Sequence, residues 1–313
     1  MTMLVLGAGG QLGRSFLAHS SLAALDHVVA ATRDGQLDGR RVETVDMADG
    51  ASLRAVLDRV SPSLIINAAA YTAVDRAESE ESLAARINGE APGIIGDWAA
   101  RHDALVVHFS TDYVFDGALT RPYRVDDAPN PISAYGRSKL AGERALAATG
   151  APHFIFRTAW VYAAQGNNFL RSMLRLAEER TELRIVNDQF GSPTCTSLLV
   201  EATLAAIDRW RRTPVPGRGE LEGTYHVVSS GITTWHDFAT LIFQKARATG
   251  LLKTVPTVIP IGTGDYPAAA RRPAWSVLDN TTFCQRFDFA MPDWRDGLEE
   301  TINKLYAEAN RSC

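Results

Sequence analysis

The first half of the chain alternates short apolar runs with longer stretches in which apolar positions recur at helical spacing. Residues 3–6, 27–32, 64–67 and 104–110 have the length and near-continuous hydrophobicity of buried parallel strands. Residues 11–19 and 52–60 have the helical pattern, and Pro131 and Ser133 begin a further helix that extends to about residue 148. This alternation predicts an α/β fold, a Rossmann-type doubly wound parallel sheet with helices on both faces.

The second half is less regular, because prolines and glycines interrupt it at Pro193, at residues 214–219 and at residues 256–267. We expect residues 1–160 to form the Rossmann-type domain and residues 161–313 to form a smaller lobe. That lobe should be partly interleaved with late strands of the sheet, near Ile185 and at residues 225–228.

Composition fits an enzyme of the reducing cytoplasm. A chain of 313 residues that is 46% hydrophobic and 22% charged can bury one large core or two smaller ones. Its net charge of −4 provides no basic footprint for nucleic acid, and no apolar run reaches the length of a membrane span. Met1 leads almost directly into a strand, so we expect no signal peptide. Cys195, Cys284 and Cys313 are odd in number and far apart, which favours neither disulfides nor a zinc site.

Three glycines, Gly7, Gly10 and Gly13, follow the first strand and open the first helix. Glycine permits a tight turn there and lets the backbone approach a pyrophosphate, while the helix N-terminus offers N–H donors to the phosphates. Gln11 and Leu12 belong to the same helix start. This arrangement predicts a dinucleotide site.

The end of the second strand, Ala31-Thr32-Arg33, indicates which dinucleotide is preferred. An acidic residue at this point would bind the ribose diol of NAD, whereas a hydroxyl and a guanidinium suit a 2′-phosphate. We therefore expect NADPH, with NADH as the alternative that Asp34 keeps open. Further cofactor contacts are expected after the next two strands, from Asp46 and Met47 near the adenine and from Ala68, Ala69 and Ala70 at the sheet edge.

Tyr135 and Lys139 stand four residues apart on the helix that follows Ser110-Thr111. A phenol titrates near pH ~10 in water, so it needs help to exchange a proton at neutral pH. A lysine one turn away supplies a positive charge that lowers this pKa, and it can also hold the nicotinamide ribose. Thr111 is placed to hydrogen-bond a substrate oxygen, and Asn88 to support Lys139 through water. This set predicts hydride transfer between a nicotinamide cofactor and a carbonyl or alcohol.

With these residues the chain resembles the extended short-chain dehydrogenase/reductase superfamily, and within it the dTDP-4-dehydrorhamnose reductase family. The likeness extends over nearly the whole chain and rests on five runs, at residues 67–75 (NAAAYTAVD), 110–117 (STDYVFDG), 157–162 (RTAWVY), 188–194 (DQFGSPT) and 271–273 (RRP). The resemblance implies reduction of the C4 ketone of dTDP-4-dehydro-L-rhamnose to dTDP-L-rhamnose. That sugar donor serves bacterial cell-surface polysaccharides such as lipopolysaccharide.

The resemblance also assigns roles to residues. It makes Tyr135 the proton donor, Lys139 its activator and Thr111 the hydroxyl that orients the carbonyl. The residues that it implies for substrate binding are Thr111, Asp112, Tyr113, Tyr135, Trp160, Gln189, Pro193, Thr194 and Arg272. Arg272 is expected at the diphosphate or the base, because a guanidinium fork suits phosphate oxygens, and Arg171 is a second candidate.

One feature departs from the family. Some of its members form a dimer bridged by Mg²⁺ through carboxylates, which motif offset would place at Ser15, Ser197 and Lys304. None of these is an acid, and Mg²⁺ requires oxygen ligands that a lysine would repel. We therefore expect no metal, and a monomer or a homodimer without a metal bridge.

Two other functions stay open. A nucleotide-sugar epimerase or dehydratase would use the same fold, but a dehydratase needs a further acid pair, commonly Asp-Glu, where this chain has Asp112-Tyr113. A non-catalytic NADP-binding subunit, like the β-subunit of methionine adenosyltransferase, is the third. Intact Thr111, Tyr135 and Lys139 argue against it.

Overall fold

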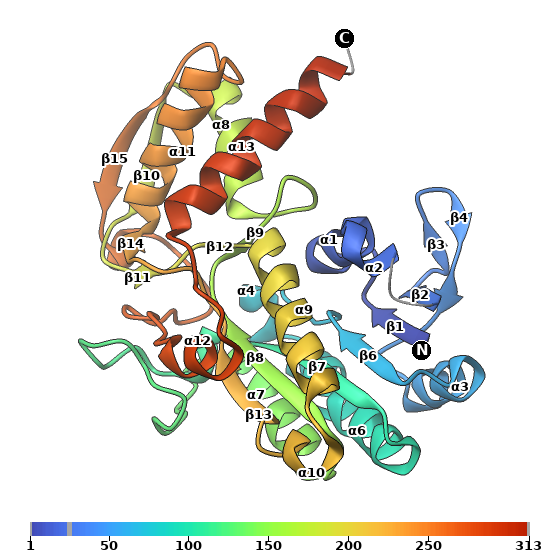
Figure 1. Cartoon of the computed structure of the whole chain (residues 1–313). Helices are drawn as coiled ribbons and strands as arrows, with labels where there is room; N and C mark the ends of the chain where they lie inside the picture. Colours follow the sequence, from blue (N-terminus) through green and yellow to red (C-terminus); the bar gives the residue numbers. More distant parts are fainter. Residues whose placement is uncertain (1, 24–26, 312–313) are drawn as a thin grey trace.

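A parallel sheet lies at the centre of the molecule (Figure 1). The structure, a computed structural model, describes residues 2–23 and 27–311, and within them seven strands are ordered β13-β8-β7-β6-β1-β2-β5, every neighbouring pair parallel. In sheet order their bounds are Gly223–His226, His153–Thr158, Leu105–Thr111, Leu64–Asn67, Thr2–Leu6, His27–Thr32 and Glu43–Thr44. The predicted doubly wound sheet is confirmed.

Both faces of this sheet are covered, so its central strands are buried. All seven residues of β7 and all four of β6 are buried. Met3 and Val5 of β1 face one hydrophobic cluster, while Leu4 and Leu6 face another. Continuous hydrophobic runs are typical of parallel strands buried on two sides.

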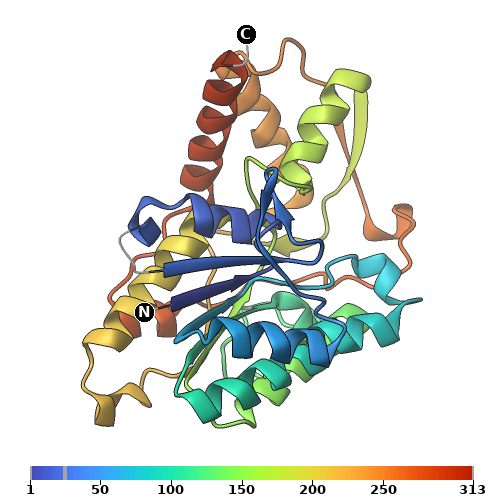
Figure 2. The same cartoon turned by 90° about the vertical axis from the view of Figure 1, so that its right-hand side faces the viewer.

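Helices pack on each face (Figure 2). On one side lie α1 (Gln11–Ala18) and α9 (Thr196–Arg212), and on the other α3 (Gly50–Val60), α6 (Ala91–His102) and α7 (Ala134–Ala147). Shorter helical pieces are α2 (Ser20–Ala23), α4 (Val74–Ala77), α5 (Glu81–Ala84), the π-helix η1 (Ala85–Glu90), η2 (Asp112–Val114), α10 (Val215–Arg218), η3 (Thr263–Asp265) and α12 (Thr281–Phe287).

A lobe of later residues lies above α9 in the view of Figure 1. It contains α8 (Phe169–Glu179), α11 (Trp235–Thr249) and α13 (Trp294–Arg311) with the parallel pair β10 (Glu182–Val186) and β15 (Thr257–Ile261). Small pairs connect it to the rest, namely β9 (Val161–Tyr162) with β12 (Thr194–Cys195) and β11 (Phe190–Gly191) with β14 (Thr233–Thr234). The hairpin β3 (Gln36–Leu37) and β4 (Arg40–Arg41) follows β2.

Of the strands in the second half of the chain, β13 joins the main sheet and β10 lies in the lobe. The strand containing Tyr225, β13, joins the edge of the main sheet beside β8, two residues earlier than the predicted 225–228. The expectation of a main-sheet strand near Ile185 is wrong, because β10 pairs with β15 in the lobe. Its burial alternates, unlike that of β7, because a strand in a small sheet keeps one face toward solvent.

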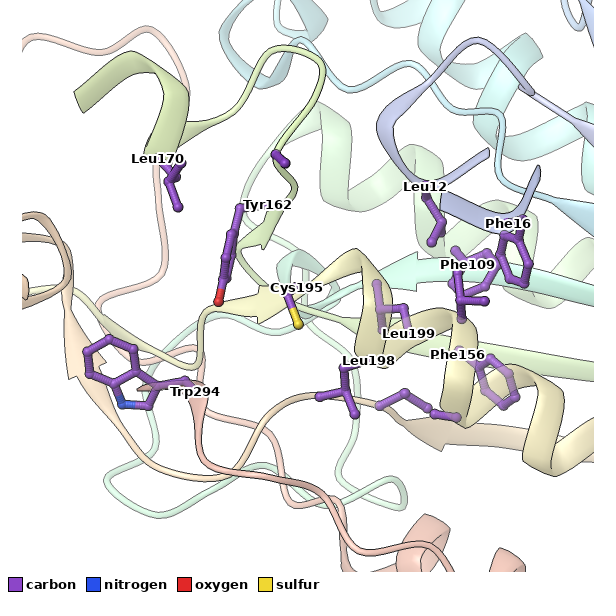
Figure 3. Close-up of a cluster of buried hydrophobic side chains, with 14 of the residues drawn as sticks. Leu12, Phe16, Phe109, Phe156, Tyr162, Leu170, Cys195, Leu198, Leu199 and Trp294 are labelled. Carbon is purple, nitrogen blue, oxygen red and sulfur yellow. The ribbon is translucent and has the colours of Figure 1, made fainter. Parts of the chain in front are cut away.

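One hydrophobic cluster runs from the sheet into the lobe (Figure 3). Phe16 of α1 and Phe109 of β7 lie at one end of it, and Leu170 of α8 and Trp294 of α13 at the other. Cys195 and Tyr162 lie between them, so the lobe is held by apolar packing rather than by a linker alone.

The structure also bears on the cysteines and on membrane-spanning helices. Cys195 and Cys284 are free thiols, and Cys313 lies outside the described residues. Within the described part of the chain, no helix combines the length and the apolar character needed to cross a bilayer.

Candidate active site

The carboxyl ends of the parallel strands meet at one edge of the sheet, and the chain reverses its winding direction between β1 and β6. Crevices at such switch points are where open α/β sheets bind ligands. Gly7 follows β1 here, and Ala68, Ala69 and Ala70 follow β6, all partly exposed. A Cβ atom on Gly7 would lie 2.6 Å from the Ala69 backbone nitrogen, so the loops after the two strands fit together only because residue 7 is glycine.

The glycines leave an open helix start. Gly7 has a φ of 75°, in the left-handed region that glycine adopts most readily, and a Cβ on Gly13 would collide with the Gly7 carbonyl. Gly10 is the N-cap of α1, and no side chain among the described residues caps this helix. The first N–H groups, including those of Gln11 and Leu12, therefore remain available to an anion.

At the end of β2, the Asp34 carboxylate is hydrogen-bonded, whereas the Arg33 guanidinium is exposed. Asp34 Oδ1 accepts hydrogen bonds from the Gln36 N–H and the Thr32 hydroxyl, which lower the pKa of Asp34. That acid is thereby committed to the turn into the β3–β4 hairpin. Arg33 is exposed, and no hydrogen bond or ion pair engages its guanidinium among the residues described. Asp46 is exposed and accepts from the Ala48 N–H, with Met47 half-buried beside it.

Tyr135 lies in the first turn of α7. Ser133 caps this helix by accepting from the Gly136 N–H at 3.1 Å, and a Cβ on Gly136 would collide with the Tyr113 carbonyl. This close approach brings the rings of Tyr113 and Tyr135 edge to face, with centroids 5.5 Å apart. Desolvation raises the pKa of Tyr135 to about 12, and a hydrogen bond to Thr111 opposes the shift. The lowering of this pKa that the sequence predicted from Lys139 is not found, because burial dominates and the charge of Asp112 adds to it, so the phenol keeps its proton.

Lys139 lies one turn further along α7 and is buried, with 1% of its surface exposed. Its Nζ donates to the Phe109 carbonyl at 2.6 Å and lies 3.3 Å from His108 Nε2. Burial lowers the pKa of Lys139 to about 8, and the charge of Glu143 opposes this. The ammonium is thus held by neutral acceptors on β7, with a carboxylate only at longer range.

Thr111 ends β7 with its hydroxyl already committed. Oγ1 donates to Asp112 Oδ1 at 2.9 Å and accepts from the Tyr113 N–H at 3.2 Å. Asp112 is 2% exposed, its Oδ2 has no partner among the described residues, and burial raises its pKa to about 6. Since the threonine proton points toward Asp112 and one lone pair accepts from Tyr113, the second lone pair is the one left for Tyr135.

Asn88 makes direct hydrogen bonds to the loop after β6 and to α7. It lies in the π-helix η1, where its side chain accepts from the Tyr71 N–H at 2.8 Å and donates to the Tyr71 carbonyl and to Ser138 Oγ. These bonds hold the loop after β6 against α7. A water on the Lys139 ammonium would need an acceptor on Asn88, and the second lone pair of its amide oxygen is free for one, so the water bridge stays a prediction.

A cavity of about 700 Å³ opens in the lobe between α8, β10 and the segment containing Tyr266 and Arg272. Gln189 and Arg272 both line it. Gln189 donates to Thr263 Oγ1 at 3.1 Å, and Arg272 Nη2 lies 2.7 Å from Asp75 Oδ2, which lowers the pKa of Asp75. Aliphatic and aromatic side chains form most of the rest of the wall, among them Phe169, Met173, Leu176, Ile185 and Trp235.

The other residues expected at the substrate lie further from this cavity. Trp160 has a φ of 48° and stacks on Trp235, with centroids 3.5 Å apart. Pro193 and Thr194 are buried, and the Thr194 hydroxyl is used by the Ser192 carbonyl and the Ser229 N–H. Arg171 is exposed on α8 and lines a different depression.

One depression of about 230 Å³ is lined by Ser15, Ser197 and Lys304. The three positions that were inferred from their distance to sequence motifs are therefore neighbours in space. Ser15 Oγ lies 2.7 Å from Thr196 Oγ1, and Ser197 Oγ lies 3.2 Å from Cys195 Sγ. Glu201 and Glu300 also line it, yet the described residues contain no group of three or more metal-ligating side chains. Metal independence stays a prediction.

The sequence did not single out His108 or the ion pair of Glu143 and Arg157. His108 is a histidine within an otherwise apolar buried strand, and Glu143 follows Lys139 by four residues on α7. Arg157 Nη2 lies 2.7 Å from Glu143 Oε2, both side chains nearly inaccessible, and Ser110 Oγ also donates to Glu143. A polar residue in a buried strand, and a helix position four residues after Lys139, are the signals that would have found them.

Comparison with known proteins shows the family to which the chain is similar. The family model described as "RmlD substrate binding domain" matches residues 1–307. The dTDP-4-dehydrorhamnose reductase of Burkholderia thailandensis is 45% identical over 98% of this chain and 100% of its own. Two crystal structures of dTDP-4-dehydrorhamnose reductases, from Clostridium acetobutylicum and, in complex with NADP, from Bacillus anthracis, superpose with TM-scores of 0.85. They are 34% and 33% identical, and each comparison covers 97% of this chain and 99% of the other.

Proposed function

We propose that the chain, which belongs to the dTDP-4-dehydrorhamnose reductase family, reduces the C4 ketone of dTDP-4-dehydro-L-rhamnose to dTDP-L-rhamnose with NADPH. The product would serve cell-surface polysaccharide synthesis, and the free thiols Cys195 and Cys284 suit the reducing cytoplasm. The observation that carries the proposal is the convergence of Thr111, Tyr135 and Lys139 at the switch-point edge of the sheet.

The residues at that edge fit a dinucleotide. Gly7 and Gly13 leave room where any side chain would collide, and the uncapped start of α1 offers free N–H donors to a pyrophosphate. Arg33 is unpaired among the described residues while Asp34 is held in a turn, an asymmetry that favours a 2′-phosphate over a ribose diol. The cofactor contacts proposed alongside these are Thr32, Asp46, Met47 and Ala68 to Ala70. When bound, the dihydronicotinamide supplies a hydride.

The protein's own groups handle the proton. The carbonyl oxygen becomes an alkoxide as the hydride arrives at C4, and the Tyr135 phenol gives its proton to that oxygen. Because burial keeps this phenol protonated, the acid is present before substrate binds. Lys139 places a positive charge one turn away, which stabilises the phenolate that remains. Thr111 and Tyr113 complete the wall around the oxygen.

The nucleotide would occupy the 700 Å³ cavity next to this edge. Its apolar wall suits a pyrimidine ring, and Arg272 and Gln189 provide the polar contacts. Trp160, Pro193 and Thr194 would then act behind this wall, as packing that shapes it. Diphosphate oxygens would compete with Asp75 for Arg272, since a guanidinium can form bidentate bonds to either.

The decisive test is a product-identified assay with purified protein, dTDP-4-dehydro-L-rhamnose and each coenzyme separately. We expect NADPH oxidation that requires the 4-keto sugar and yields dTDP-L-rhamnose, with dTDP-glucose, which lacks the ketone, as the matched negative substrate. Conversion of the sugar without net coenzyme oxidation would instead identify an epimerase or dehydratase. Coenzyme binding without any sugar conversion would identify a regulatory subunit.

A further inference from the structure

We propose that His108 is a positioning residue for Lys139, accepting a hydrogen bond from the lysine ammonium through Nε2 while Asn67 holds the ring through Nδ1. This inference rests on the proposed reductase function only for its kinetic consequences. His108 lies on β7, 1% exposed, with Lys139 Nζ 3.3 Å from Nε2 and the Asn67 side-chain amide 3.0 Å from Nδ1.

The direction of both bonds follows from the chemistry of the groups. An ammonium only donates, so Nε2 must carry a lone pair and the proton of the neutral ring must be on Nδ1. Nδ1 then needs an acceptor, whereas Asn67 turns its Nδ2 toward it. Rotating this amide by 180° brings Oδ1 to the ring, an exchange of two atoms whose placement is a matter of assignment. Asn67 Oδ1, which otherwise has no partner in the described part of the chain, gains one by the same rotation.

The charges around His108 keep its ring neutral. Lys139 on α7 and His153 on β8 are the titratable groups that face it, and together with burial they hold the pKa of His108 well below its ordinary value. Glu143, one turn further along α7, acts on Lys139 in the opposite sense, favouring the ammonium. A protonated His108 would face the lysine with two like charges, so the acceptor role is the state in which the pair is attractive.

These hydrogen bonds fix the position of the Lys139 ammonium. The Phe109 carbonyl and His108 Nε2 take two of its three protons, which leaves one N–H for a ligand or a neighbouring hydroxyl. Backbone carbonyl and imidazole both belong to the rigid strand β7, so Lys139 is anchored to the sheet rather than free to follow α7 alone. Loss of one acceptor should destabilise the charged form and loosen its position.

Two substitutions separate this role from simple packing. His108→Leu removes the acceptor, whereas His108→Gln keeps one, because its Oε1 can reach the place of Nε2. His226→Leu is the matched control, since His226 is also a buried strand histidine with a lowered pKa but bonds the Asp279 carbonyl. Each variant is assayed for kcat and kcat/KM against pH, with NADPH binding measured by fluorescence in the absence of sugar.

We expect His108→Leu to shift the alkaline limb of kcat/KM to lower pH by about one unit, as loss of a charge-assisted bond predicts. Its activity at pH 8 should fall about tenfold and its NADPH affinity should weaken, while His108→Gln restores most of both. An unchanged limb in His108→Leu, or the same shift in His226→Leu, would overturn the proposal.

A second measurement does not depend on activity or on the stability of a variant. In wild-type protein labelled with ¹⁵N-histidine, the His108 resonances, assigned by their absence in His108→Gln, should report a neutral ring protonated at Nδ1. A ring protonated at Nε2 would refute the proposal. If the wild type fails to reduce the 4-keto sugar, the proposed function fails, yet this tautomer and the coenzyme affinities still decide the role of His108.

Discussion

Asp112→Asn should change how the stability of the protein depends on pH. Asp112 is 2% exposed, and its Oδ1 accepts a hydrogen bond from the Thr111 hydroxyl at 2.9 Å. Burial raises its pKa from 3.8 to about 6. The folded state therefore holds this proton more tightly than the unfolded chain does.

The sign follows from that difference. The stabilising contribution of Asp112 is complete below the unfolded pKa of 3.8 and is lost as pH rises through about 6. A shift of about two pH units corresponds to about 3 kcal/mol, which is the cost of carrying the ionised carboxylate in the core above pH 7. Asparagine carries no charge and keeps an oxygen for Thr111, so the variant lacks this dependence.

The assay is urea unfolding of wild type and variant at several pH values from 4 to 8. The new amide donors cost about 1–3 kcal/mol if unpaired, but that cost is the same at every pH. The stability of Asp112→Asn relative to wild type should therefore rise by about 3 kcal/mol across the range, whatever its starting value. A difference that stays constant with pH would refute the reasoning.

A control is available on the same loop. Asp116 accepts bonds from the Ala118 N–H, the Tyr123 hydroxyl and the Asn130 side chain, which lower its pKa. The pKa of Asp116 in the folded state lies below its value of 3.8 in the unfolded chain, so its carboxylate is ionised in both states over most of this pH range. Asp116→Asn should thus lose stability by a nearly constant amount over the same range, and only Asp112→Asn should show the slope.

Four further outcomes are expected. Tyr135→Phe should lower turnover by about 10²–10⁴ with little change in NADPH affinity, and near-normal turnover would remove Tyr135 from the mechanism. Arg33→Ala should weaken NADPH binding but not NADH binding in a titration, and equal effects on both would contradict a phosphate contact. Arg272→Ala should raise KM about tenfold or more with a smaller effect on kcat, and an unchanged KM would leave Arg272 paired with Asp75 for structure alone. Dialysis against a chelator should leave activity and solution mass unchanged, and activity restored specifically by Mg²⁺ would reveal a metal site.

The sheet was predictable because its strands carry the signal in their own residues. A strand buried on both faces is largely apolar, so β1, β6 and β7 stand out without any knowledge of their neighbours, and the partly buried β2 carries a similar apolar run. The same reasoning failed at Ile185, since burial of β10 depends on which strand pairs with it. Pairing partners far apart in sequence leave no local trace.

The site shows the same division. Spacing on α7 predicted that Tyr135 and Lys139 share a helical face, and the end of β7 placed Thr111 near them. Spacing could not predict which side chains pack around them. Asn88 bonds Tyr71 from within a π-helical turn, and the pKa of Tyr135 is raised because the loop of Tyr113 closes over it. Both effects come from packing between segments distant in sequence.

These surroundings set the protonation states that the proposed mechanism would use. Between about pH 6 and 8, Asp112 is ionised, Lys139 is charged and Tyr135 is protonated, since their pKa values are about 6, 8 and 12. Reduction of a ketone needs one proton and one positive charge to stabilise the phenolate left behind, and this combination supplies both. Above that window Lys139 loses its charge long before Tyr135 loses its proton. If Tyr135 and Lys139 act as proposed, we therefore expect the alkaline limit of catalysis to follow the lysine, and the groups on β7 that hold the lysine, rather than the phenol itself, to determine where that limit lies.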